Sequence, residues 1–157
     1  MTEWKQNGFI ISTNKNQLDI DTIFHFLCND SYWAKGVSRQ TVEKSINNSM
    51  LCFGIYKEGL NESWEQVGFA RVITDLTTLA YLCDVFILPA YRGLGLSKWL
   101  VKTIINYPEL QGVRRFMLAT FDAHSLYSKF GFEQLDTPER FMQITGNKIG
   151  VPAETEN

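Results

Sequence analysis

The sequence contains few cysteines, and their arrangement excludes several protein classes. Only three occur in 157 residues, and Cys28, Cys52 and Cys83 form neither a Cys-x-x-Cys pair nor a metal-ligand spacing. A disulfide-rich fold is therefore not expected, and we predict no metal. Buried, reduced thiols are the simplest interpretation. Cys83, which lies in an apolar run, stays open as a nucleophile that carries an acyl group.

Neither an excess of charge nor a long apolar run is present. Lys and Arg number 15 against 17 Asp and Glu, which gives a formal net charge of −2 and no basic face of the kind that binds nucleic acid. No apolar run approaches the roughly 20 residues of a membrane span. Residues 1–5 lack the basic-then-apolar layout of a signal peptide. We therefore expect a cytoplasmic protein that binds neither nucleic acid nor membrane.

What the chain does have is the composition of an ordinary globular domain. Hydrophobic residues make up 45% of it and charged residues 20%. Its length fits one domain with a sizeable core. No repeat, low-complexity segment or linker interrupts the chain, so we predict a single domain over residues 1–157, with a frayed polar tail at 147–157.

The most informative stretch begins with an apolar, β-favouring run at 81–88, which Pro89 ends because proline cannot donate to a strand ladder. Gly93 and Gly95 then form a short turn. Apolar residues recur at helical spacing over 96–104. The pattern predicts a strand, a glycine-rich turn and a helix.

This arrangement predicts an anion site. The first amides of a helix have no intrahelical acceptor, and the helix dipole places partial positive charge there. Glycines let the main chain approach a phosphate closely, and Arg92 adds a cation. The spacing lacks the Gly-Lys-Ser/Thr ending of a P-loop and the third glycine of a dinucleotide-binding turn, so neither of these is expected.

The rest of the chain alternates between strand-like and helix-like segments. Strands are expected at 9–13, 51–56, 66–75, 114–120 and 140–145, and helices from 20 to about 29, and at 38–48, 96–107 and 122–131. Asp19 or Asp21 is expected to cap the first helix. Asp122 is expected to cap the last helix, and Gly131 to close it.

Two stretches resemble motifs of the GNAT superfamily of N-acetyltransferases. The first reads Ile87-Leu88-Pro89-Ala90-Tyr91-Arg92-Gly93-Leu94-Gly95-Leu96-Ser97. It is similar to the family's acyl-CoA-binding pattern, Arg/Gln-x-x-Gly-x-Gly/Ala after a strand that ends in Val-x-Pro. Ser97 stands where the family usually has Gly or Ala, and it is a small residue too. The second reads Leu126-Tyr127-Ser128-Lys129-Phe130-Gly131-Phe132 and resembles the family's Leu-Tyr-x-Lys/Arg-x-Gly-Phe run.

The resemblance covers most of the chain and implies an α/β (α+β) fold. Its central sheet is mixed and mostly antiparallel, with helices on both sides. The fourth and fifth strands, here 81–87 and 114–120, splay apart, and acetyl-CoA lies in the wedge as co-substrate. The residues implied to bind it are Val85, Phe86, Ile87, Arg92, Gly93, Leu94, Gly95, Leu96, Ser97 and Tyr127.

The implied activity is transfer of the acetyl group to a primary amine by direct attack in a ternary complex. Tyr127 matches the family's tyrosine acid, which protonates the departing thiolate. The family's usual base position falls near Tyr81. Asp84, a carboxylate within an apolar strand, is therefore the candidate base, and a proton path through water is the alternative. Trp33, Tyr81 and His124 are candidate acceptor-binding residues.

The sequence leaves the acceptor open between a small-molecule amine and a protein amine, and the assembly open between monomer and homodimer. Two other functions also remain: a catalytically silent acyl-CoA sensor or regulatory domain of the same fold, and a non-enzymatic interaction domain. Arg92 beside the glycine pair argues against the interaction domain, because a plain turn needs no arginine.

Overall fold

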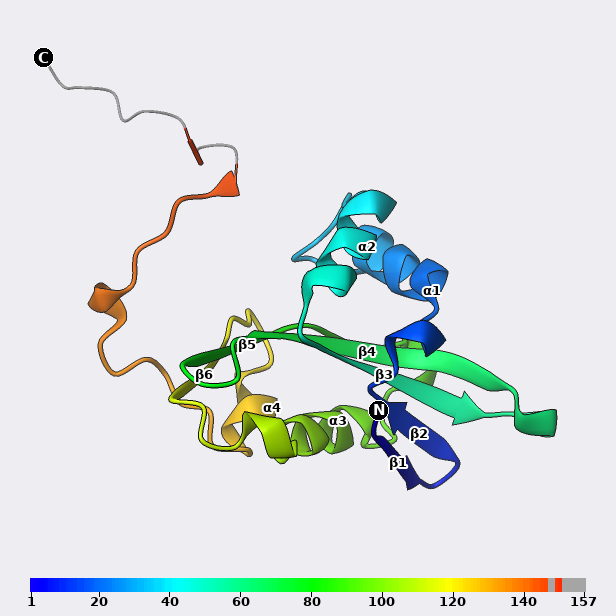
Figure 1. The fold of residues 1–157 in the computed structure, drawn as a ribbon. Helices are drawn as coiled ribbons and strands as arrows, with labels where there is room; N and C mark the ends of the chain where they lie inside the picture. Colours follow the sequence, from blue (N-terminus) through cyan, green and yellow to red (C-terminus); the bar gives the residue numbers. More distant parts are fainter. Residues whose placement is uncertain (147–148, 151–157) are drawn as a thin grey trace, which may run out of the picture.

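The centre of the molecule is a six-stranded sheet in the order β1-β2-β3-β4-β5-β6 (Figure 1). The computed structural model describes residues 1–146 and 149–150. Neighbouring strands are antiparallel up to β5, whereas β6 runs parallel to β5. The strands span Glu3–Gln6 (β1), Phe9–Ser12 (β2), Leu51–Glu58 (β3), Trp64–Thr74 (β4), Leu79–Ile87 (β5) and Arg115–Leu118 (β6). This is the mixed, mostly antiparallel sheet that the resemblance implies.

Two helices cover each face of the sheet (Figure 1). The helices α1 and α2 lie on one face, and α3 and α4 lie on the other. They span Ile20–His25 (α1), Arg39–Asn48 (α2), Leu96–Ile105 (α3) and His124–Ser128 (α4). The carboxylate of Asp19 accepts the amide of Thr22 and so begins α1, which continues as a π-helical turn over Phe26–Asp30.

The alternation of side chains along β3 divides the core between the two faces. Phe53 and Ile55 are fully buried in the cluster that includes α3. Cys52, the residue before Phe53, belongs instead to the cluster under α1 and α2. Successive residues of a strand point to opposite faces, so this strand packs against both helical layers.

The first hairpin is a correction to the sequence-based expectation, which had no strand before residue 9. Asn7 and Gly8 both have positive φ, +50° and +79°, and they join β1 to β2 with Gln6 opposite Phe9. This is the geometry of a type I′ hairpin turn, for which Asn-Gly is the strongest short sequence signal. The signal was present in the sequence.

The strand expected at 140–145 is also wrong. Pro138–Arg140 forms a 3₁₀ turn, and residues 141–145 are not in a strand. A strand exists only as part of a ladder, and residues 142–145 make no backbone hydrogen bond to another described segment. The predicted frayed tail at 147–157 lies outside the described residues, apart from 149 and 150.

The strands β5 and β6 share only a short ladder. Leu79–Leu82 pairs with Arg115–Leu118, and β5 then continues to Ile87 without β6 beside it. These are the two strands predicted to splay, and the fold prediction is confirmed. Within the described residues, no helix has both the length and the apolar character needed to cross a membrane.

Candidate active site

The turn between β5 and α3 depends on two glycines in the left-handed region. Gly93 and Gly95 have φ of +81° and +78°, and Gly95 is the residue that precedes the first turn of α3. An added Cβ would meet nothing within 4 Å at either position. The requirement for glycine is therefore conformational, and the space outside the turn is open.

The main-chain donors of this turn are available. Among the described residues, no hydrogen-bond acceptor faces the amides of residues 93–98, and the first amide of the helix that is bonded is that of Trp99, to the Gly95 carbonyl at 3.1 Å. The exposed Arg92 lies beside them, with its Nε on the Ile87 carbonyl at 3.1 Å. A hollow of about 370 Å³ opens at this point. Free amides, a helix N-terminus and a cation are together the features that anion-binding sites use.

The side chains of this turn differ in their exposure. Leu94 is 60% exposed, whereas Leu96 is 5% exposed and packs in the core against the sheet. Leu96 can therefore reach a ligand only through its amide.

A bulge interrupts β5 next to the wedge. Phe69 pairs with Phe86 and Arg71 pairs with Cys83, so Asp84 and its successor lie together opposite a single residue of β4. Asp84 has φ of +55°, a conformation that is rare for a residue with a side chain. Bulges of this kind redirect side chains and are common beside active sites.

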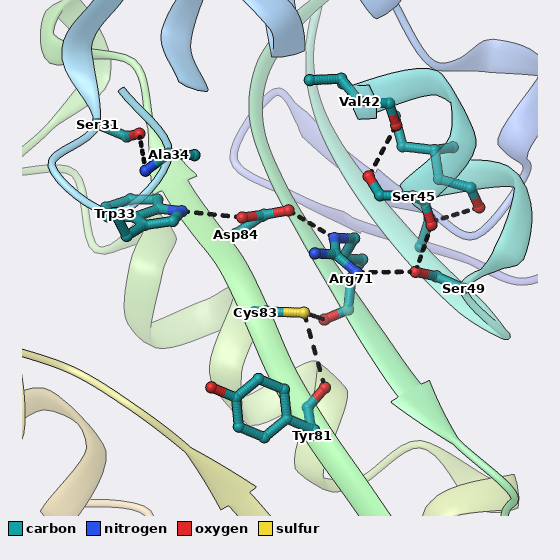
Figure 2. Close-up of polar contacts among 12 residues, drawn as sticks. Ser31, Trp33, Ala34, Val42, Ser45, Ser49, Arg71, Tyr81, Cys83 and Asp84 are labelled. Carbon is teal, nitrogen blue, oxygen red and sulfur yellow. Dashed lines mark hydrogen bonds and ion pairs between the residues drawn. The ribbon is translucent and has the colours of Figure 1, made fainter. Parts of the chain in front are cut away.

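The redirected side chain of Asp84 joins two elements (Figure 2). Its Oδ1 accepts the indole N–H of Trp33 at 2.9 Å, and its Oδ2 pairs with Nε of Arg71 at 2.5 Å. Arg71 also donates to the hydroxyl of Ser49 at 3.2 Å, and this hydroxyl donates to the carbonyl of Ser45. Both carboxylate oxygens are therefore engaged within the protein.

Burial acts on the charged and polar groups of this network. The side chains of Arg71 and Asp84 are 16% and 9% exposed. Burial alone would lower the pKa of Arg71, but the charge of Asp84 and its hydrogen bond raise it above the usual value. Burial raises the pKa of the Cys83 thiol to about 11. A thiol that stays protonated at neutral pH is a poor nucleophile, which disfavours the acyl-carrier role for Cys83.

The main chain at the end of β5 has one face toward β4 and one toward the wedge. The amide of Leu88 donates to the carbonyl of Val67 on β4. Successive residues of a strand direct their amides alternately, so the amide and the carbonyl of Ile87 face away from β4. The bond from Arg92 to the Ile87 carbonyl agrees with this direction. The ring of Phe86 instead stacks on Phe26 with a centroid distance of 4.0 Å, on the α1 face.

Tyr127, on α4, forms the end of the wedge. It is 8% exposed, and its hydroxyl has no hydrogen-bond partner among the described residues. Burial raises its pKa to about 12, and the nearby Tyr32 and Asp122 add to this effect. A protonated hydroxyl without a protein partner is free to donate to a ligand.

A pocket of about 410 Å³ occupies the wedge between these groups. Asp84 and Val85 line it from β5, Tyr127 from α4, and two loops complete it through Trp33 and Phe121. Ile87 on β5 and Leu126 on α4 line the hollow at the glycine turn. Because the lining residues are neighbours along both β5 and α4, the two hollows follow one another. A long ligand can occupy both.

Comparison with known proteins identifies the family. The model of the acetyltransferase (GNAT) family matches residues 20–132. The chain is also 34% identical over 142 residues to FG08082 of Gibberella zeae, a protein named as an acetyltransferase. The match covers 80% of this chain and 79% of that protein.

The chain belongs to the GNAT family.

Solved GNAT structures share the fold. A structure from Xanthomonas campestris, described as an acetyltransferase of the GNAT family, is 42% identical with a TM-score of 0.82, and the match covers 90% of this chain and 96% of that one. A Clostridium acetobutylicum protein described as an acetyltransferase was solved with acetyl-CoA. It is 14% identical with a TM-score of 0.63, and the match covers 87% of this chain and 96% of that one. At that identity the likeness supports the fold alone.

The GNAT wedge contains most of the residues predicted for it. Tyr81, Asp84 and Tyr127 line one pocket with Trp33. His124 does not: it is exposed and lines a different hollow, between the outer side of β6 and residues 133–136. Among the described residues, no three His, Cys, Asp or Glu side chains lie close enough to hold a metal ion.

Three residues of this GNAT site were missed by sequence reasoning. Arg71 on β4 pairs with Asp84 because the bulge in β5 redirects that carboxylate, and no local sequence pattern reveals this contact. Phe121 and Asp122 follow β6 in a loop that also lines the pocket. Asp122 was expected to cap a helix, but α4 begins after Ala123 and has no side-chain cap.

Proposed function

We propose that the protein transfers the acetyl group of acetyl-CoA to a primary amine by direct attack within a ternary complex. The observation that carries this proposal is a pair of hollows whose lining residues are neighbours along β5 and α4. One presents the free amides of residues 93–98, and the other holds the unpartnered hydroxyl of Tyr127. A phosphate-bearing ligand with a long arm and a reactive end fits this arrangement.

The residues of the first hollow suit the diphosphate of coenzyme A. The amides of residues 93–98 supply hydrogen bonds, the N-terminus of α3 supplies partial positive charge, and Arg92 supplies a full charge. The main-chain groups of Ile87 face the wedge, where they can pair with the amide groups of the pantetheine arm. Phe86, which the resemblance also implied, is turned away from this hollow: its ring is buried on the other side of β5, and by the same alternation its main-chain groups face β4.

The second hollow suits the chemistry at the thioester. The main-chain amide of Ile87, which faces away from β4, polarises the carbonyl as negative charge develops on its oxygen. Tyr127 donates its proton to the sulfur as the thiolate leaves, because its raised pKa keeps the hydroxyl protonated. The donor supplies the activated acyl group, and the chain supplies position and this proton.

The attacking amine must lose a proton, and Asp84 is a poor recipient. Both of its oxygens are engaged, one by the indole N–H of Trp33 and the other by Nε of Arg71. We propose that the proton leaves through water at the open pocket and that Asp84 acts as a positioning residue for Trp33. Asp84→Asn separates the two roles. Loss of a base abolishes turnover, whereas loss of a positioning residue raises KM for the amine and leaves much of kcat.

Acetyl-CoA binding is the first test. A ligand at about 100 times its Kd stabilises the folded state by about 2.7 kcal/mol. For a domain of this size, that corresponds to a rise in Tm of about 5–10 °C. Arg92→Ala should weaken binding about tenfold, because it removes a charged hydrogen-bond donor. Arg114→Ala, at another exposed arginine, is the matched control and should bind like the wild type. If saturating acetyl-CoA leaves Tm unchanged, the proposal is wrong.

Amine-dependent release of free thiol is the second test. Tyr127→Phe should lower kcat by about 100-fold or more, the usual contribution of a positioned acid. It should have little effect on stability, because the hydroxyl has no partner to lose. A silent acyl-CoA sensor would show the rise in Tm with acetyl-CoA and no thiol release with any amine.

A further inference from the structure

The acceptor end of the wedge pocket is an aromatic surface. Tyr32, Trp33 and Phe121 are 56%, 43% and 83% exposed, although all three are large and apolar. The ring of Tyr32 makes a T-shaped contact with each of the other two rings, with centroid distances of 5.1 Å to Trp33 and 6.0 Å to Phe121. Exposed apolar side chains gathered in a concave site indicate a binding surface.

This surface is held in place from both sides. The amide of Phe121 donates to the hydroxyl of Tyr32 at 2.9 Å, which joins the loop after β6 to the loop before α2. The indole N–H of Trp33 donates to the carboxylate of Asp84, which holds the edge of this ring (Figure 2). The rings are therefore positioned before a ligand arrives, which reduces the entropy lost on binding.

The charge of the pocket has one sign. Its lining contains two carboxylates, Asp84 and Asp122, and no Lys, Arg or His. Arg71 neutralises Asp84 from beneath. The exposed Asp122 has no ion pair or side-chain hydrogen bond with any described residue. Its charge therefore faces the pocket uncompensated.

An uncompensated carboxylate beside aromatic faces selects cations. Ring faces attract ammonium groups, and Asp122 adds a charge of opposite sign. An acceptor that carries a carboxylate would be repelled, because no cation lines the pocket to receive it. The reacting amine must itself be neutral when it attacks, so a retained positive charge has to come from a second group on the acceptor.

We propose that the acceptor is a short diamine. One amine is acetylated, and the second remains an ammonium ion bound by Asp122 and by the ring faces of Tyr32, Trp33 and Phe121. This inference rests on the proposed function, because it names the substrate class of the same site. The step forms the amide bond and breaks the thioester. The attacking nitrogen loses one proton and the departing sulfur gains one, so the products are the amide and the free thiol.

Acceptors of equal length test the charge. Thiol release is measured with 1,4-diaminobutane, 1-aminobutane, 4-aminobutanoate and a short peptide with a free N-terminus, at equal concentrations of the neutral amine form. The expected order of kcat/KM is diamine, then 1-aminobutane at least tenfold lower, then 4-aminobutanoate lowest. Preference for the peptide or for 4-aminobutanoate overturns the inference.

Asp122→Asn tests the residue. It should raise KM for the diamine far more than KM for 1-aminobutane, so that the ratio of the two kcat/KM values falls toward one. Asp136→Asn, at an exposed aspartate on the other side of Tyr127, is the matched control and should keep the diamine preference. Equal losses with both amines would mean that Asp122 supports the structure of the site, and would overturn its assigned role.

A ligand that cannot react separates this inference from the proposed function. Binding of N,N,N′,N′-tetramethyl-1,4-diaminobutane is measured by calorimetry on the wild type, Asp122→Asn and Trp33→Leu, and both variants should bind about tenfold more weakly. Such binding without thiol release from any amine refutes the proposed function and supports the diammonium site. Thiol release with amines that carry no second charge, without binding of this ligand, supports the proposed function and refutes the diammonium site.

Discussion

The ion pair between Arg71 and Asp84 makes a prediction that can be worked out quantitatively. Removing one partner of a buried pair leaves the other charge without compensation, which destabilises a protein by about 3–5 kcal/mol. The two side chains are 16% and 9% exposed, so water cannot replace the missing partner fully. Asp84→Asn is the appropriate variant, since asparagine tolerates the positive φ at this position, whereas alanine would add strain.

We expect Asp84→Asn to lower the free energy of unfolding by about 3 kcal/mol and Tm by about 10 °C, and Arg71→Met to do the same. The double variant removes both charges. Its loss of unfolding free energy should be smaller than the sum of the losses in the two single variants. Urea unfolding of all four proteins gives the coupling energy of the pair, which should be about 2 kcal/mol or more.

The exposed pair Arg39–Glu43 on α2 is the matched control, because its side chains are 48% and 44% exposed. Pairs of this kind contribute about 0.3–0.5 kcal/mol and are screened by salt. The reasoning fails if the coupling between Arg71 and Asp84 is as small as that of the control, or if it is lost equally in high salt.

The remaining predictions concern the glycine turn, the acid and a loop. Gly95→Ala forces a Cβ into φ of +78°, so stability should fall by about 1–2 kcal/mol and the rise in Tm with acetyl-CoA should shrink; an unchanged rise would argue against this turn as the anion site. Burial, aided by Tyr32 and Asp122, raises the pKa of Tyr127 to about 12, so kcat should show no alkaline decline up to about pH 10; a decline near pH 9 that Tyr127→Phe removes would contradict this. The Thr78 hydroxyl and the amides of Thr77 and Thr78 hold the pKa of Asp75 below its usual value of 3.8, so its contribution to stability is present at neutral pH and lost as pH falls below about 4. Urea unfolding at pH 7 and about pH 3 should show a smaller acid loss for Asp75→Asn than for the wild type.

The donor half of the site could be predicted from the sequence because its parts are contiguous. A strand end, a proline, two glycines and a helix start all lie within 81–104, and each has a local signal. Tyr127 could be placed for the same reason, through the motif around it. The hairpin of β1 was also within reach, since Asn7-Gly8 has only one common use between two β-favouring runs.

The acceptor half could be predicted only in part: Trp33 and Tyr81 were candidates and line the pocket, but the contacts that hold this half together join distant segments. Tyr32 and Phe121 are separated by 89 positions in the chain. The alternation of side chains along a regular strand does not predict that Asp84 contacts both Trp33 and Arg71, because the bulge changes the register. The expected strand at 140–145 shows the opposite error: the local pattern was suitable, but no described segment pairs with it.

The brevity of the ladder between β5 and β6 has a consequence for how such a protein can diversify. Within the described chain, the ladder between the two strands is limited to Leu79–Leu82 and Arg115–Leu118. The pocket begins where this ladder ends. The loop at 119–123 can therefore change its composition without disturbing the glycine turn that follows β5. On the proposed function, new acceptors can be gained on one wall while the other wall keeps its site for the coenzyme.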